Sequence, residues 1–281
     1  MGKARKRSID PLKLLCTALL ALVAAVFIYP VFLNVVTSFK SEDAVIANPL
    51  SLPTDPSLDA YVTVWRLLGL DSLMLNSLLY SAAGTGFALV LAIFPAYAFS
   101  RFRFPGRRTT FILLLTTLML PQQAVVIPLY RLLTEMQLLN TRPGLIIVHA
   151  GYGMAYELLL IAGYMASLPK ELEEAARVEG CSDWGVLRYV VLPLSVPAMV
   201  VAFLLNFIGI WKEFLFALTF VSSQSAFPMT VGVLKLTVQQ YFTEFPLPAA
   251  AVVLAQLPML LVFLVAHRWL TQGIYTGAVK A

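Results

Sequence analysis

Long stretches without a charged residue alternate with short charged loops along the chain. Charge-free stretches cover 14–39, 72–100, 109–130, 189–211 and 245–267, and a further stretch, 143–169, is interrupted only by Glu157. About 20 apolar residues in a helix cross the hydrocarbon core of a bilayer. The pattern predicts an all-α membrane protein, a single domain over 1–281 with six transmembrane helices near 12–37, 72–98, 109–131, 143–167, 194–222 and 246–268.

Composition narrows the class of protein. Hydrophobic residues make up 59% of the 281 residues and charged residues only 12%, against about 25% charged in an ordinary soluble domain. This excludes a typical soluble enzyme. The net charge of +5 does not indicate a nucleic-acid partner, because in a membrane protein the placement of basic residues matters more than their sum. Two cysteines are too few for a disulfide framework.

The basic residues predict the orientation. With a cytoplasmic N-terminus, most of the Lys and Arg residues fall on the cytoplasmic side, in the N-terminal run, in the loop after the second span and in the loop after the fourth. The positive-inside bias therefore favours six spans with both termini cytoplasmic. The start could also be a signal peptide, but its apolar stretch is longer than a signal h-region, which favours a retained first span.

One inside loop, residues 169–193, has a different chemistry. Pro169 can open a first short helix, Gly180 offers a left-handed stop, and Ser182 or Asp183 can cap a second. The loop holds a third of the acids of the chain, Glu171, Glu173, Glu174, Glu179 and Asp183. An anionic leaflet repels such a helix, so the alternatives are a solvated linker and a surface that docks on another protein. Small alanines beside a carboxylate favour docking.

The residues of this loop resemble a known motif. Its pattern matches the EAA loop (EAA-x3-G-x9-I-x-LP) of permease subunits in bacterial ATP-binding-cassette (ABC) importers, with Val190 at the usual Ile, on Glu174, Ala175, Ala176, Gly180, Leu192 and Pro193. Segments 101–106, 118–121, 211–218 and 268–280 are similar to those of the MalG-like, carbohydrate-uptake branch. Lys212 departs from the Asn usual in that branch, which puts in doubt any transfer of that position's role.

The resemblance implies a type I ABC importer permease fold, with a cytoplasmic EAA coupling helix between spans four and five. It implies a sugar permease of the bacterial inner membrane that docks an ATP-binding subunit through the six EAA-loop residues. Expected partners are a second permease (MalF-like), two copies of the ATP-binding subunit and an extracytoplasmic solute-binding protein. Residues 222–245 are expected to face the binding protein, and the tail near Lys280 the ATP-binding subunits. The chain has no G-x4-GK[ST] loop, so ATP and Mg²⁺ are expected on the partner, with no cofactor and no enzymatic activity here.

Polar residues inside the predicted spans are candidates for a substrate path. Trp211 is the strongest for stacking on a sugar, with an interfacial anchor as its competing role. Glu157 and Lys212 differ in depth by about 10 Å at 1.5 Å per residue, so no pair is expected, and His149 is expected at a span edge. The full set of candidates is Gln122, Glu157, Asn206, Trp211, Lys212 and Glu213.

Two other classes of function compete. A stand-alone secondary transporter would use Glu157 or Glu213 for ion coupling, but no internal repeat is evident and the acidic loop has no purpose in it. An intramembrane enzyme needs a nucleophile or metal constellation, and the sequence offers neither. The transported solute stays open among sugars, polyols and glycerol phosphates.

Overall fold

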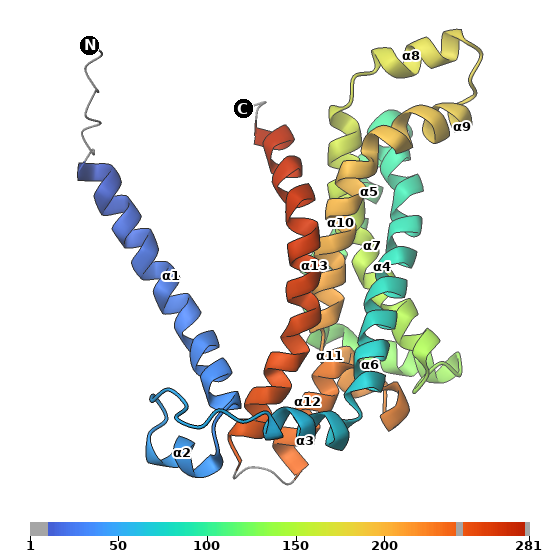
Figure 1. The fold of residues 1–281 in the computed structure, drawn as a ribbon. Helices are drawn as coiled ribbons and strands as arrows, with labels where there is room; N and C mark the ends of the chain where they lie inside the picture. The colour runs from blue at the N-terminus through green and yellow to red at the C-terminus, as the bar shows by residue number, and fades with distance from the viewer. Residues whose placement is uncertain (1–10, 240–243, 279–281) are drawn as a thin grey trace, which may run out of the picture. The chain divides into compact units, whose positions relative to one another are not determined.

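The computed structural model describes residues 11–239 and 244–278, and the regular structure within these ranges is entirely helical (Figure 1). The all-α prediction is confirmed over these ranges. The chain divides into two compact units, one formed by residues up to 67 with 236–254, the other by 68–235 with the residues from 255 onward. The basic residues of 3–7, on which the orientation prediction rests in part, and Lys280, on which the tail prediction rests, lie outside the described residues.

The first unit begins with α1 (Pro11–Ser38), an apolar helix that buries only 6% of its membrane-length window. A helix that is apolar on every side is suited to lipid or to another membrane helix. Asn34 Nδ2 donates to the Ala249 carbonyl at 3.2 Å, which ties the end of α1 to the first turns of α13. The unit also contains α2 (Glu42–Ala47) and α3 (Asp59–Leu68), and α13 spans Pro246–Ala278.

The second unit is built around three helices that pack along their lengths, α4 (Leu70–Arg101), α7 (Arg142–Ser167) and α10 (Leu192–Lys212). On α4, Ala88, Ala92 and Ala96 repeat every four residues and are completely buried. Small residues at this spacing let helix backbones approach closely in a membrane. The remaining helices are α5 (Arg107–Thr116), α6 (Gln122–Glu135), α8 (Glu171–Val178), α9 (Asp183–Val186), α11 (Leu215–Phe220) and α12 (Met229–Gln239).

Among the described residues, five helices are long and apolar enough to cross a membrane, or six if one bent pair counts as a span. The prediction of a single third span at 109–131 is wrong in its geometry. The chain breaks between Met119 and Gln122, and the two halves differ in direction by 101°. Pro121 has no N–H to donate and holds Leu120 in an extended conformation (φ −77°, ψ 120°).

The fifth span, predicted at 194–222, is also corrected. The helix ends at Lys212, and a separate helix, α11, begins at Leu215 within the predicted span. The Glu213 carboxylate accepts the N–H groups of Phe216 at 2.7 Å and Ala217 at 3.3 Å, so it caps α11 instead of continuing α10. The loop predicted after this span contains a further helix, α12, and α13 continues past the predicted end at 268.

Candidate functional site

The 169–193 segment folds as the two short helices that the sequence predicts. α8 begins at Glu171, two residues after Pro169, and Gly180 takes the left-handed conformation (φ +90°) at the corner. Ser182 Oγ accepts the N–H of Gly185 at 3.3 Å and caps α9. Figure 1 shows α8 and α9 beyond the ends of α4, α7 and α10.

The five acids of this segment do not share one environment. Glu173 is turned inward, with its side chain 3% exposed, and pairs with Arg101 of α4. Asp183 accepts from Arg177 at 3.1 Å, and this hydrogen bond raises the pKa of the Arg177 guanidinium. Asp183 is exposed although it is paired, and Glu171, Glu174 and Glu179 are exposed as well.

Some of the six residues of the EAA-like pattern are exposed, and the others are partly buried. Ala176 and Leu192 are partly buried against a core cluster that includes Ile161, Val186 and Leu187. The remaining four, Glu174, Ala175, Gly180 and Pro193, are exposed.

Pro193 has a further structural effect. The turn before it, Leu187–Val191, is π-helical, and the Leu192 N–H donates to the Leu187 carbonyl five residues earlier. Pro193 cannot donate to the chain, and its ring would clash with the carbonyl four residues before it, which accounts for the wider turn. Pro193, at the end of the EAA-like pattern, therefore widens the helical turn through which the chain enters α10.

Large apolar side chains are exposed on and beside α8 and α9. Val178 is 89% exposed, Tyr189 74% and Trp184 60%, and Leu172 is also exposed. Apolar side chains grouped in this way, with carboxylates between them, are typical of a protein interaction surface.

A cavity of about 280 Å³ lies among α6, α7, α10 and α11. Three of the six substrate-path candidates line it: Gln122, Asn206 and Glu213. Its wall also contains Tyr152, Tyr156 and His149. His149 is inside α7 and 5% exposed, so the prediction that it lies at a span edge is wrong. The tyrosines were not predicted either, because an aromatic residue in an apolar span carries no signal that separates lining from packing.

Glu157 lies behind this wall and is completely buried. Its Oε1 accepts from Asn206 Nδ2 at 2.8 Å, and its Oε2 finds no hydrogen-bond partner among the described residues. Gly153 makes the approach of the Asn206 side chain possible, since a Cβ atom there would be 2.9 Å from Oδ1 and closer still to Nδ2. Glu157 therefore pairs with Asn206, not with Lys212.

Trp211 and Lys212 do not line the cavity. The Trp211 indole is 6% exposed, stacks on Phe207 with ring centroids 6.3 Å apart, and donates to the Ala255 carbonyl of α13 at 3.3 Å. Lys212 is exposed. In this conformation the indole therefore joins two helices.

A buried polar cluster holds the segment 222–229 against α4 and α7. Asn76 donates to the carbonyls of Ser225 and Phe227 at 2.9 and 3.0 Å and accepts from Arg142 Nε at 3.1 Å. The Tyr80 hydroxyl donates to the Ala226 carbonyl at 2.7 Å. This segment belongs to the stretch predicted to face a binding protein, and these bonds give it a fixed conformation.

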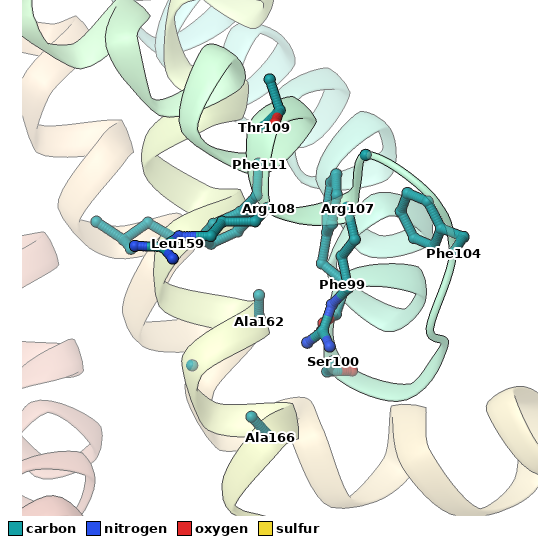
Figure 2. Close-up of a pocket in the computed structure, with 12 residues that line it drawn as sticks. Phe99, Ser100, Phe104, Arg107, Arg108, Thr109, Phe111, Leu159, Ala162 and Ala166 are labelled. Carbon is teal, nitrogen blue, oxygen red and sulfur yellow. The ribbon is translucent and has the colours of Figure 1, made fainter.

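A larger cavity, about 830 Å³, lies between α7 and the turn from α4 to α5 and contains none of the predicted site residues. Figure 2 shows Arg108 reaching across to Leu159 of α7, while Arg107 turns back toward Ser100. Arg107 donates to the Phe99 carbonyl and so closes the turn.

Known proteins resemble this chain over the regions that contain the cavity and the α8–α9 segment. Residues 84–275 match the sequence profile of the binding-protein-dependent transport system inner membrane component family. The diacetylchitobiose uptake system permease protein NgcG of Streptomyces coelicolor is 30% identical over 264 residues, 94% of this chain and 87% of that protein. The arabinooligosaccharides transport system permease protein AraQ of Halalkalibacterium halodurans is 28% identical over 280 residues, 98% of this chain and 99% of that protein.

A chain from the crystal structure of a bacterial ABC transporter involved in the import of the acidic polysaccharide alginate has the same fold. It superposes with a TM-score of 0.80 at 24% identity, over 95% of this chain and 99% of that one. The profile match extends from within α4 into α13, so it contains both the cavity and the α8–α9 segment.

Proposed function

This chain belongs to the binding-protein-dependent transport system inner membrane component family, and from this premise we propose that it forms half of the translocation path of an ATP-driven sugar importer. In this proposal both termini are cytoplasmic and the protein is a multi-pass subunit of a bacterial inner membrane. The 169–193 segment, named here the coupling segment, docks an ATP-binding subunit on the cytoplasmic side.

The observation that carries the proposal is the exposed surface of α8 and α9. Val178 and Leu172 lie among exposed carboxylates, a combination suited to neither lipid nor water. A groove in a folded protein would cover the apolar side chains and leave the acids at its rim. Because the sequence has no phosphate-binding loop, ATP and Mg²⁺ bind the partner, and its closure moves α8.

The remaining partners complete the path. A second permease of the MalF type supplies the other half, two ATP-binding subunits supply the energy, and an extracytoplasmic solute-binding protein delivers the solute. The exposed side chains of Ser222, Gln224 and Ser225, in the segment that these bonds fix, offer that protein a preformed surface. The exposed, largely apolar α1 is suited to contact lipid or the second permease.

A sugar is the solute class favoured by the relatives, which take up diacetylchitobiose and arabinooligosaccharides. The cavity offers matching chemistry, because Gln122 and Asn206 can exchange hydrogen bonds with hydroxyl groups and Tyr152 and Tyr156 offer flat apolar faces. Substrate-path roles for Trp211 and Lys212 require a conformation in which these side chains reach the path.

The alternative function, a stand-alone secondary transporter, is disfavoured. The family is defined by dependence on a binding protein, and the Glu213 carboxylate is used to cap α11. Glu157 is held by Asn206 behind the cavity wall.

The test is purification of the tagged chain with its genomic neighbours, followed by ATP-driven uptake in proteoliposomes. We expect a stable complex with an ATP-binding subunit and a second permease, and uptake only when the binding protein is present. Uptake by the chain alone would overturn the proposal. A panel of sugars tested for binding to the binding protein identifies the solute.

Gly180 gives a matched pair of variants. A Cβ atom there has nothing within 4 Å, so a substitution is opposed only by the left-handed backbone. Gly180→Asn, which tolerates this conformation, should transport normally, whereas the β-branched Gly180→Val should assemble yet hydrolyse ATP without uptake. Equal uptake by both variants would refute a role for the corner.

A further inference from the structure

The charged residues between α4 and the coupling segment form a connected ladder. Arg101, the last residue of α4, directs Nε to Glu173 Oε1 at 2.5 Å. The other carboxylate oxygen, Oε2, lies 3.9 Å from Arg177, which in turn donates to Asp183 of α9 at 3.1 Å. Four charges of alternating sign therefore join α4, α8 and α9.

The inner half of this ladder is shielded from water. The Arg101 and Glu173 side chains are each 3% exposed, whereas those of Arg177 and Asp183 are 41% and 59% exposed. Attraction between charges is strong where water is excluded and weak at the surface. Arg101 also donates to the Leu168 carbonyl at 3.4 Å, so one guanidinium holds both α8 and the chain that leads into it.

The other described contacts of α8 with the core are apolar. Its outward side chains are exposed, Val178 most of all, and its C-terminal end leads into the Gly180 corner. Ala176 and Leu168 are partly buried and pack against the core cluster that contains Tyr97 and Phe99 of α4. A force on the outer face of α8 thus reaches α4 most directly through Glu173 and Arg101.

We propose that the buried Arg101–Glu173 ion pair is the strut that makes the coupling helix move together with α4, with Arg177 and Asp183 extending it to α9. Both residues act as positioning residues. This inference rests on the proposed function, since it requires that an ATP-binding subunit moves α8. Coupling then depends on the strut, because a partner that moves α8 without moving the bundle does not change the path.

The test uses the complete importer reconstituted in proteoliposomes, with ATP hydrolysis and uptake measured on the same preparation. Arg101→Glu and Glu173→Arg each break the pair, and the double variant restores it with the charges exchanged. Each single variant should co-purify with the ATP-binding subunit while uptake per ATP hydrolysed falls about tenfold or more, within the usual range of coupling between sites. The exchanged pair should recover part of the loss, because Glu173→Arg also places a second positive charge beside Arg177, which lies 3.9 Å from Glu173 Oε2.

Arg103→Glu is the matched control, because it makes the same change two residues away at an exposed position and should couple normally. Glu173→Gln, which keeps the shape of the side chain, covers the case in which a charge reversal does not fold, and should show a smaller loss of uptake per ATP. Normal coupling in Glu173→Gln and in the single reversals, or failure of the exchanged pair to recover any coupling while the complex is intact, would overturn the strut. Absence of ATP-driven uptake with the unmodified chain would instead overturn the proposed function.

Discussion

Gly153→Ala should be one of the most damaging single-methyl changes in the membrane part of this protein. The new Cβ atom would meet the Asn206 side chain, whose Oδ1 and Cγ lie at 2.9 and 3.0 Å from it, with Nδ2 closer. Asn206 joins α10 to α7 and is 9% exposed, so it has little room to move. The variant must displace this side chain or separate the helices.

Three effects set the size of the destabilisation. Overpacking a close-packed site costs about 1–3 kcal/mol. Displacing Asn206 also removes its 2.8 Å hydrogen bond to Glu157, worth about 1.5–3 kcal/mol where the carboxyl is charged. Alanine regains up to about 1 kcal/mol of helix propensity. The free energy of unfolding should therefore fall by about 1.5–6 kcal/mol.

Gly151→Ala is the matched control, two residues away on the same helix with nothing within 4 Å of its Cβ atom. Unfolding in mixed micelles, followed by tryptophan fluorescence, compares the two variants. Gly151→Ala should be as stable as the unmodified protein or slightly more so. Adding Gly153→Ala to Asn206→Ala should cost little further, because the clashing side chain is already gone. Equal stability of Gly153→Ala and Gly151→Ala would refute this account of the packing between α7 and α10.

Other changes test the remaining parts of the fold. Asn76→Ala removes three hydrogen bonds and should lower the free energy of unfolding by about 2–4 kcal/mol. Tyr80→Phe removes one hydrogen bond and should lower it by only about 0.5–1.5 kcal/mol. Comparable losses in the two variants would argue against Asn76 as the main residue that holds the segment 222–229. Asn140→Ala, at φ 58° and with Oδ1 accepting the N–H groups of Ser222 and Ser223, should speed proteolysis after residue 221 without dissociating the complex. Ser182→Ala should cost about 0.5–2 kcal/mol in the local stability of α9, seen as faster hydrogen exchange confined to that helix; unchanged exchange there would contradict the cap.

The membrane helices could be predicted because the absence of charge is a property of each segment alone. The positions at which these helices break could not be predicted. Pro95, Pro128 and Pro197 lie inside continuous helices, while Pro121 lies at a bend of 101°. A transmembrane helix tolerates proline when neighbours satisfy the freed backbone groups. At the bend, the Tyr152 hydroxyl donates to the Leu120 carbonyl at 2.5 Å, and this partner is 32 residues away in the sequence.

The cavity shows the same division between local and long-range information. The sequence alone indicates Gln122, Asn206 and Glu213, because a polar residue stands out in an apolar stretch. Which of the candidates share a wall depends on how α10 and α11 meet, and that depends on the cap made by Glu213. Trp211 is on the same stretch of chain yet contacts α13.

The structure separates the acidic residues of the coupling segment into two groups. In the sequence its five acids form one cluster, and a cluster of that kind favours one docking surface. Glu173 is instead paired inside with Arg101, a residue 72 positions earlier, and Asp183 pairs with Arg177. Apart from these two paired acids, of which only Glu173 is buried, Glu171, Glu174 and Glu179 lie beside exposed apolar side chains. In the proposed importer the two groups of acids have different tasks, since the exposed ones meet the motor subunit and the buried one carries its movement inward. Neutralising an exposed acid should therefore weaken binding, whereas neutralising Glu173 should leave binding intact and reduce transport.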